Sequence, residues 1–303
     1  MYDIIGDVHG QAGMLKDLLR KMGYTAANGY FSHPSRKAVF VGDFINRGPQ
    51  IKETIRIIRS MTENAAAYAI LGNHEVNALF YTLLDKEGKH LSKRWSRLRM
   101  DLNPTLAEFA GNKEKWNEQV QWMRSLPLFL ELDGIRVVHA CWQDENIRLL
   151  KEAFCENPKL KKKQLKLIGR NHNVLAKAFW ETCKGIDFSL PKDLLIFDKE
   201  GCAHRSFRSR WWESPEGKTF EELSFESRFE LPKYQIPKEL VVAREPYPAD
   251  APIVFFGHYC MRNGSNRIKH NVCCLDSCVS RKGKLTAYRW SGEKSLLDEN
   301  FVQ

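Results

Sequence analysis

Five short motifs place Asp, His and Asn residues directly after apolar, β-branched runs. They are GDVHG at 6–10, GDFINRG at 42–48, GNHE at 72–75, VHA at 138–140 and FFGH at 255–258. Oxygen and nitrogen side chains gathered at the ends of several strands are the ligands that a two-metal site for phosphate ester hydrolysis requires. Any one motif alone is better explained as a hydrogen-bonded surface or core residue. The five together favour a metal site.

The motif side chains offer several kinds of metal ligand. Asp7 and His9 lie two residues apart, so at a strand end they can point to the same side and chelate one ion. Asp43 has two oxygens and can bridge two ions. Asn73 offers a neutral oxygen. The remaining nitrogen ligands are His139 and His258.

Two further residues of the motifs suit catalysis better than metal binding. His74 follows Asn73 directly, points in another direction and can act as an acid. Arg47 cannot bind a metal, but its planar guanidinium group matches the geometry of a phosphate.

The elements that must position these residues alternate strands with helices. Apolar runs predict strands at 2–6, 38–41, 65–71, 135–139, 253–256, 272–275 and 284–290. Apolar residues spaced by three and four predict helices at 12–22 and 51–61, and residues 76–128 are expected to be largely helical. Repeated strand, site and helix predict a layered α/β fold with the ligands at the carboxyl ends of the strands.

The middle of the chain departs from this pattern. Residues 143–250 are charged, punctuated by proline and helical only in part. We therefore expect one domain over 1–303, with an insertion or cap at 143–250 over the site.

Composition limits the class of protein. The chain has 303 residues, 43% of them apolar, which suits one large α/β domain or one domain with an insertion. No stretch approaches the roughly 18 apolar residues of a membrane span, and the N-terminus has no signal-peptide pattern. We expect a soluble, cytoplasmic protein with no membrane partner.

The eight cysteines lack the regular spacing of a disulfide framework, so we expect reduced thiols. Cys273, Cys274 and Cys278 form a cluster that could bind zinc, but burial as small apolar residues is favoured.

The net charge of +10 favours an anionic partner. Lysines at 159–170 are expected to form a solvated surface. The segment 204–210 contains three arginines and is followed by Trp211 and Trp212, so it is the better candidate for binding a phosphate.

The combined motifs resemble the calcineurin-like metallophosphoesterases, on the branch shared by phosphoprotein phosphatases and bacterial diadenosine tetraphosphatases. The resemblance covers about 1–142 and 252–291, including the closing segment 271–290, and leaves out the middle. It implies a metallophosphoesterase-type layered β-sandwich flanked by helices. It also implies hydrolysis of a phosphate ester or anhydride by a hydroxide held between two divalent ions. Mn²⁺ is preferred, with Fe, Zn or Ni as alternatives, because three imidazoles favour softer metals than an all-oxygen cage does.

The resemblance also implies a role for each motif residue. The first ion would bind Asp7, His9 and Asp43, and the second would bind Asp43, Asn73, His139 and His258. His74 would protonate the leaving oxygen, and Arg47 would bind the phosphoryl group.

Two residues depart from the family pattern. Asn46 stands where phosphoprotein phosphatases have an Asp that pairs with the catalytic His. Asn46 can accept a hydrogen bond but supplies no charge, so we expect a weaker or lower-pH acid function for His74. Trp142 stands where the family usually has Gly, and it could either narrow the site with a stacking face or pack beneath a cap.

The substrate is left open by the motifs. Related phosphatases place a further Arg over the phosphate, and Arg205, Arg208 and Arg210 are candidates here, with Arg208 chosen. A phosphoprotein, a nucleotide or dinucleoside polyphosphate, and an RNA end are all possible substrates, and the basic, aromatic middle favours the nucleic acid types.

Two other classes of function are retained. A phosphate-binding protein that has lost catalysis is disfavoured, since every ligand and the acid are present. A nucleic-acid-binding module rests on charge alone, without a recognisable motif. The sequence does not indicate the oligomeric state.

Overall fold

The computed structural model describes residues 1–90, 95–154, 160–170, 173–198, 201–225, 229–241, 245–261 and 266–303. The chain divides into two compact units. Unit 1 comprises Met1–Cys183 and Pro252–Gln303, and unit 2 comprises Lys184–Ala251.

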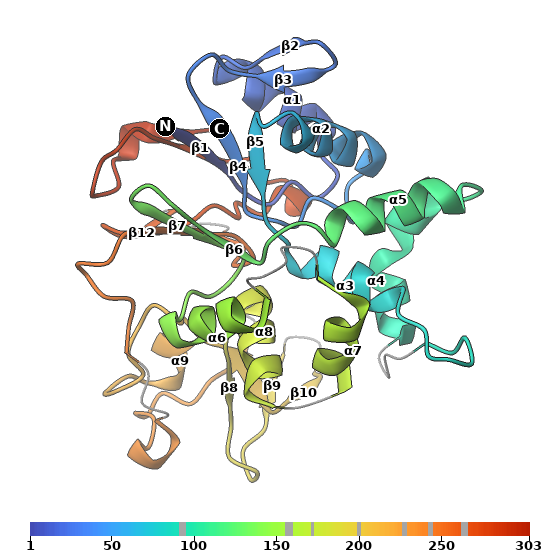
Figure 1. Ribbon diagram of the computed structural model, residues 1–303. Coiled ribbons are helices and arrows are strands. Elements are labelled where there is room, and N and C mark those ends of the chain that lie inside the picture. Colours follow the sequence, from blue (N-terminus) through green and yellow to red (C-terminus); the bar gives the residue numbers. More distant parts are fainter. Residues whose placement is uncertain are drawn as a thin grey trace. The chain divides into compact units, whose positions relative to one another are not determined.

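Over its described residues, unit 1 is built on two five-stranded sheets (Figure 1). The strand order is β16-β15-β1-β4-β5 in one sheet and β13-β14-β12-β7-β6 in the other. The first sheet contains β1 (Tyr2–Ile5), β4 (Lys37–Phe40), β5 (Ala67–Ala69), β15 (Ala287–Trp290) and β16 (Phe301–Val302). The second contains β6 (Phe129–Leu132), β7 (Ile135–Val138), β12 (Ile253–Phe256), β13 (Arg267–Lys269) and β14 (Val272–Cys274). A hairpin of β2 (Thr25–Ala27) and β3 (Tyr30–Ser32) stands apart.

Alternation along the strands separates the two apolar layers of unit 1. Ile4 packs with Val39, Val137 and Phe255 between the two sheets. Ile5, the next residue, belongs to the other apolar layer, which contains the apolar faces of the helices. Successive side chains of a strand point to opposite faces, and each fully buried Ile contributes roughly 1.5–3 kcal/mol to stability. The predicted layered β-sandwich flanked by helices is confirmed.

The helices of unit 1 follow the predicted pattern up to residue 128, whereas α6, α7 and α8 lie in the segment that was expected to be helical only in part. They are α1 (Ala12–Lys21), α2 (Ile51–Glu63), α3 (Asn73–Tyr81), α4 (Trp95–Glu108), α5 (Lys113–Met123), α6 (Asp144–Phe154), α7 (Lys162–Arg170) and α8 (Val174–Lys184), with short 3-10 turns η2 (Val279–Arg281) and η3 (Asp298–Asn300). Figure 1 shows α1 and α2 beside the sheet that contains β4 and β5. The largely helical nature predicted for 76–128 agrees with α3, α4 and α5.

Unit 2 has a small apolar core of its own, which includes Phe207, Phe220 and Leu223. Its elements are β8 (Asp187–Ser189), β9 (Ile196–Phe197), β10 (Ala203–His204), β11 (Ser206–Arg208), α9 (Phe220–Leu223) and η1 (Lys238–Leu240). Two short antiparallel ladders join β8 to β11 and β9 to β10, and the sequence pattern did not predict them. Residues 144–183 belong to unit 1, and the role of 143–250 as a cap stays a prediction.

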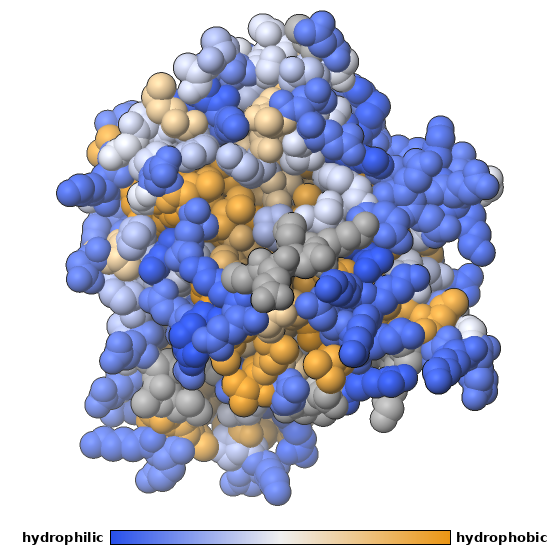
Figure 2. Space-filling view, viewed as in Figure 1, coloured by the Kyte–Doolittle hydropathy of each residue, from blue (hydrophilic) through white to orange (hydrophobic). Residues whose placement is uncertain are grey.

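The face of the molecule in Figure 2 is mostly hydrophilic, with smaller apolar patches between the polar residues. This agrees with a charged content of 28%. In the part of the chain that is described, no helix is long and apolar enough to cross a membrane.

The cysteines differ in part from the prediction. Cys260 and Cys278 form a disulfide, so the expectation of reduced thiols is wrong for this pair. Cys273 and Cys274 are fully buried in β14, where burial raises the pKa of both thiols. Their predicted role as small apolar residues agrees with this position.

Candidate metal centre

The predicted ligands follow strands that run parallel within each sheet. Asp7 and His9 follow β1, Asp43 follows β4 and Asn73 follows β5, and these three strands are parallel neighbours. In the other sheet, His139 follows β7 and His258 follows β12, and these two strands are also parallel. The carboxyl ends of parallel strands meet at one edge of a sheet, so each sheet gathers its own ligands.

Asp43 joins two clusters of possible ligand atoms. His9, Asp43 and His74 form one cluster, and Asp43, His139 and His258 form the other, with ligand atoms within 4.8 Å of one another. Asp43 Oδ2 lies 3.8 Å from His9 Nε2, and Asp43 Oδ1 lies 3.4 Å from His139 Nε2. The two oxygens of one carboxylate thus face two separate groups of donors, as expected of a bridging ligand.

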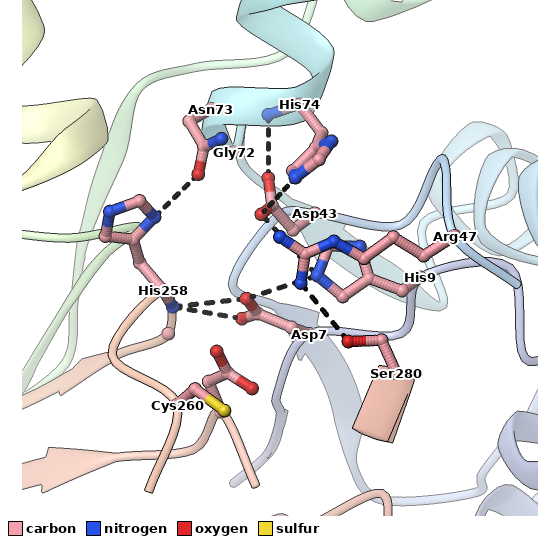
Figure 3. Close-up of polar contacts among 12 residues, drawn as sticks. Asp7, His9, Asp43, Arg47, Gly72, Asn73, His74, His258, Cys260 and Ser280 are labelled. Carbon is pink, nitrogen blue, oxygen red and sulfur yellow. Dashed lines mark hydrogen bonds and ion pairs between the residues drawn. The ribbon is translucent and has the colours of Figure 1, made fainter. Parts of the chain in front are cut away.

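Asp7 completes the arrangement from the β1 side. Its Oδ2 lies 4.0 Å from His9 Nε2 and accepts the backbone N–H of His258 at 3.1 Å (Figure 3). Gly257 makes this approach possible, because a Cβ at that position would lie 1.9 Å from Asp7 Oδ1.

Two of the histidines are oriented by backbone carbonyls. His9 Nδ1 lies 3.1 Å from the carbonyl oxygen of Ile45, and His139 Nδ1 lies 2.8 Å from that of Val41. A ring that donates from Nδ1 keeps the lone pair of Nε2 for a metal, which is how metal-binding histidines are usually held.

The Asn73 amide provides a test of whether a cation fits here. Its oxygen faces His139 Nε2 at 3.1 Å and His258 Nδ1 at 2.6 Å, as Figure 3 shows for His258. Turning the amide over would let its nitrogen donate to these two atoms and to Asp43. The other way to satisfy three converging acceptors is a cation, and this mixed oxygen and nitrogen donor set suits a divalent transition metal. The residues therefore fit the implied metal.

The pKa values of the site residues also fit a bound cation. Burial, together with Asp276 and Asp43, raises the pKa of Asp7 well above its usual value. Burial opposes a charge on His139, but Asp43 and Asp7 outweigh it and raise the His139 pKa to about 10. Asp7 and His139 therefore favour their protonated forms when no metal charge is present, and a bound cation would displace these protons.

Asn46 contacts His74 in a way that the sequence did not predict. Asn46 Nδ2 lies 2.7 Å from His74 Nδ1, so the amide donates to the ring where we expected it to accept. Burial lowers the pKa of His74 to about 3, so its protonated form is populated only at low pH. The weaker or lower-pH acid function that we expected from the missing charge at position 46 stays a prediction. His74 Nε2 lies 3.8 Å from Asp43 Oδ2.

The two predicted substrate-binding arginines lie in different units. Arg47 is exposed in unit 1, and its Nη1 donates to Ser280 Oγ at 3.2 Å (Figure 3). Arg208 lies in β11 of unit 2, and its contact with substrate stays a prediction.

Of the two roles expected for Trp142, the structure favours packing over a stacking face at the site. Its side chain is 1% exposed, Nε1 donates to Asp144 Oδ1 at 2.9 Å, and the Arg136 guanidinium group lies 4.9 Å from the ring centroid. A ring this enclosed offers no free face for stacking.

Several residues beside the site were missed by sequence reasoning. They are Glu75, Thr105, Asp276 and Ser280, of which the first three are buried. Glu75 had a recognisable signal, because an acid at the third position of a helix can accept the backbone N–H of the N-cap residue, as Glu75 does from Gly72 at 2.9 Å. Thr105 had none, since it lies within α4, far from any motif.

Comparison with known proteins identifies the class. The chain belongs to the calcineurin-like phosphoesterase family, whose model matches residues 2–272.

Among individual relatives, a protein of Oceanobacillus iheyensis named asymmetrical bis(5'-nucleosyl)-tetraphosphatase PrpE is 35% identical over 144 residues. These are 46% of this chain and 54% of the relative, so the chain spans about half of that protein's length. A symmetrical bis(5'-nucleosyl)-tetraphosphatase of Vibrio campbellii is 24% identical over 96% of both chains. The crystal structure of a cold-active protein-tyrosine phosphatase from Shewanella matches 95% of this chain and 74% of its own, with 18% identity and a TM-score of 0.50, which supports the fold alone.

Proposed function

We propose that this chain is a metal-dependent phosphoesterase that hydrolyses a phosphate ester or anhydride at a binuclear centre. The observation that carries the proposal is the position of Asp43 between two donor clusters. Asp7, His9 and Asp43 would hold one ion, and the second would bind Asp43, Asn73, His139 and His258. Two divalent ions, when bound, would activate water and offset the charge of the equatorial phosphoryl oxygens.

The residues around the ions would orient the substrate. The exposed guanidinium group of Arg47 would bind a phosphoryl oxygen, and its hydrogen bond to Ser280 would steady it. His74 would direct Nε2 toward the leaving oxygen, since Nδ1 is engaged by Asn46. Because histidine nitrogens and carboxylate oxygens are mixed, Mn²⁺ is the preferred ion, with Fe, Zn or Ni as alternatives.

A dinucleoside polyphosphate is the proposed substrate. Support comes from the names of the relatives, which are bis(5'-nucleosyl)-tetraphosphatases of both the asymmetrical and symmetrical kinds. The net charge of +10 suits a polyanionic substrate. Arg208 is retained as a possible phosphate contact. Phosphoproteins and RNA ends are the competing substrates.

A substrate panel tests this function. The chain would be assayed with Mn²⁺ against diadenosine tetraphosphate, a phosphoserine peptide, a 3'-phosphorylated oligonucleotide and p-nitrophenyl phosphate. Asp43→Asn should lower turnover at least 10³-fold, because it removes the charge shared by both ions. Asp17→Asn is the matched control, since Asp17 lies exposed on α1. Turnover that is absent with every divalent metal, or that survives Asp43→Asn, would overturn the proposal and favour a phosphate-binding protein.

A cytoplasmic location also stays a proposal. The Cys260–Cys278 disulfide weighs against a strongly reducing surrounding. Alkylation of thiols in freshly lysed cells would test it, because a reduced pair would be modified and a disulfide would not.

A further inference from the structure

The Asn46 side chain is held between Thr105 and His74. Asn46 is 1% exposed and Thr105 is 0% exposed. The hydroxyl of Thr105 accepts the backbone N–H of Asn46 at 3.2 Å and donates to Asn46 Oδ1. On the other side of the amide, Nδ2 lies 2.7 Å from His74 Nδ1. Buried polar groups are nearly always hydrogen-bonded, and here the protein groups satisfy one another.

The direction of each hydrogen bond follows from the Thr105 hydroxyl. It has one hydrogen, and among the described residues Asn46 Oδ1 is the acceptor within its reach. If the amide were turned over, its NH₂ would face the hydroxyl oxygen and the hydroxyl hydrogen would lose its acceptor. An unsatisfied buried donor costs roughly 1–3 kcal/mol. Thr105 therefore directs the NH₂ group of Asn46 toward His74.

A donor at Nδ1 decides which ring nitrogen of His74 carries hydrogen. Nδ1 must present its lone pair to Asn46, so the ring hydrogen lies on Nε2, the nitrogen 3.8 Å from Asp43 Oδ2. An Asp at position 46 would do the reverse, because a carboxylate accepts and would draw hydrogen to Nδ1.

We propose that Thr105 and Asn46 are positioning residues that hold His74 as the neutral Nε2–H tautomer, and that the enzyme thereby selects phosphoanhydrides over alkyl phosphate esters. This inference rests on the proposed function. Neutral imidazole can donate a hydrogen bond to a leaving oxygen, but it cannot readily give up its hydrogen, since imidazolate is a strong base. The leaving oxygen must therefore depart as a stable anion.

The hydrolytic step balances without proton transfer from His74. The oxygen of water forms the new bond to phosphorus, and the bond from phosphorus to the leaving oxygen breaks with its electron pair. The leaving oxygen departs as an anion, the proton released by water passes to solvent, and His74 keeps its Nε2–H. A nucleotide phosphate is stable as such an anion, whereas a serine alkoxide is not.

Nitrogen NMR tests the tautomer directly. Protein with ¹⁵N-labelled histidine would be examined metal-free and with diamagnetic Zn²⁺, and His74→Asn would assign the His74 signals. We expect hydrogen on Nε2 in the wild type and in Thr105→Ser, and on Nδ1 in Asn46→Asp. Thr105→Val should allow the amide to turn and populate Nδ1–H. A wild-type ring with hydrogen on Nδ1 would overturn the inference whether or not the protein is an enzyme.

Substrate selectivity tests the consequence. The ratio of kcat/KM for diadenosine tetraphosphate to that for a phosphoserine peptide should exceed 10²-fold in the wild type, a range that general acid catalysis typically covers. Asn46→Asp should narrow this ratio at least tenfold, and Thr105→Ser should preserve it. Thr54→Val is the matched control, because Thr54 is equally buried and its hydroxyl donates to the carbonyl of Gln50, the residue before α2.

The outcomes separate the inference from the function on which it rests. Metal-dependent turnover with an unchanged ratio in Asn46→Asp would overturn the selectivity alone. Loss of all turnover in every variant and in the wild type would overturn the proposed function, while the NMR result would still decide the tautomer.

Discussion

Glu75 accepts the backbone N–H of Asp43 at 2.8 Å and so fixes the start of the loop that carries the proposed bridging carboxylate. The same side chain accepts the N–H groups of Phe44, Ile45 and Gly72, at 2.9–3.1 Å. Asp43 has a φ of 49°, a left-handed conformation that an Asp adopts only with support. The buried carboxylate of Glu75 supplies that support.

Replacing Glu75 should therefore weaken both fold and site. Glu75→Gln exchanges one acceptor oxygen for an NH₂ group that faces backbone donors, which should cost about 3 kcal/mol of stability. We expect a lower urea midpoint and weaker Mn²⁺ binding in calorimetry. Glu63→Gln at the exposed end of α2 is the control. Equal effects of the two changes would contradict this role.

The Arg47 guanidinium group should be needed for its shape as well as its charge. Arg47→Lys keeps the charge but loses the planar fork, so kcat/KM should fall on the order of 10–100-fold. Ser280→Ala removes the hydrogen bond at 3.2 Å and should cost about 2–5-fold. Steady-state kinetics would measure both, with Arg56→Lys on the exposed face of α2 as control. A fall as large for Arg56→Lys would argue against a phosphate contact.

Gly257 should tolerate no side chain. The Cβ of Gly257→Ala would lie 1.9 Å from Asp7 Oδ1 and 3.0 Å from Val41 Cγ2, so the Asp7 carboxylate would have to move. We expect at least a tenfold loss of Mn²⁺ affinity by calorimetry. Gly13→Ala in α1 meets Gln50 Oε1 only at 3.6 Å and should stabilise the fold by about 0.5–1 kcal/mol. Unchanged metal affinity in Gly257→Ala would place Asp7 outside the first ion's ligands.

In the metal-free protein, His74 should make stability depend on pH. Its pKa is about 3 in the folded state, against about 6.5 in the unfolded chain. Between pH 6.5 and pH 3 the His74 side chain is protonated in the unfolded chain but neutral in the folded protein. The free energy of unfolding that is present above pH 6.5 is therefore lost as the pH falls. Linkage gives about 2 kcal/mol between pH 7 and pH 5. Urea titrations in EDTA should show this extra loss in the wild type relative to His74→Gln, and parallel losses would contradict it.

The Cys260–Cys278 disulfide should stabilise unit 1. It joins residues 18 apart in sequence, a span for which chain entropy predicts about 3 kcal/mol. Cys260→Ser with Cys278→Ser, or a reductant, should lower the urea midpoint accordingly. Cys202→Ser, at an exposed free cysteine, is the control. A urea midpoint that does not change when the disulfide is removed would mean that the bond does not stabilise the fold.

The sequence was informative where local pattern and chemistry coincide. Asp7 and Asp43 each follow an apolar strand, so the run that predicts the strand also places the proposed ligand. Thr105 shows the opposite case, since it contacts Asn46 across 59 residues and only tertiary packing brings them together. The strands of unit 2 are two or three residues long, too short for alternation to be recognised. The Cys260–Cys278 bond was likewise hidden, because pairing depends on geometry rather than spacing.

The position of unit 2 in the chain has an evolutionary consequence. After β7 the chain forms α6, α7 and α8, passes through unit 2 and returns in β12, which pairs directly with β7. None of the six proposed metal ligands lies within 184–251. Residues there can therefore change, lengthen or be exchanged while the strands that hold the ligands keep their register. A lineage of such proteins could diversify in this segment and inherit its proposed metal ligands unaltered.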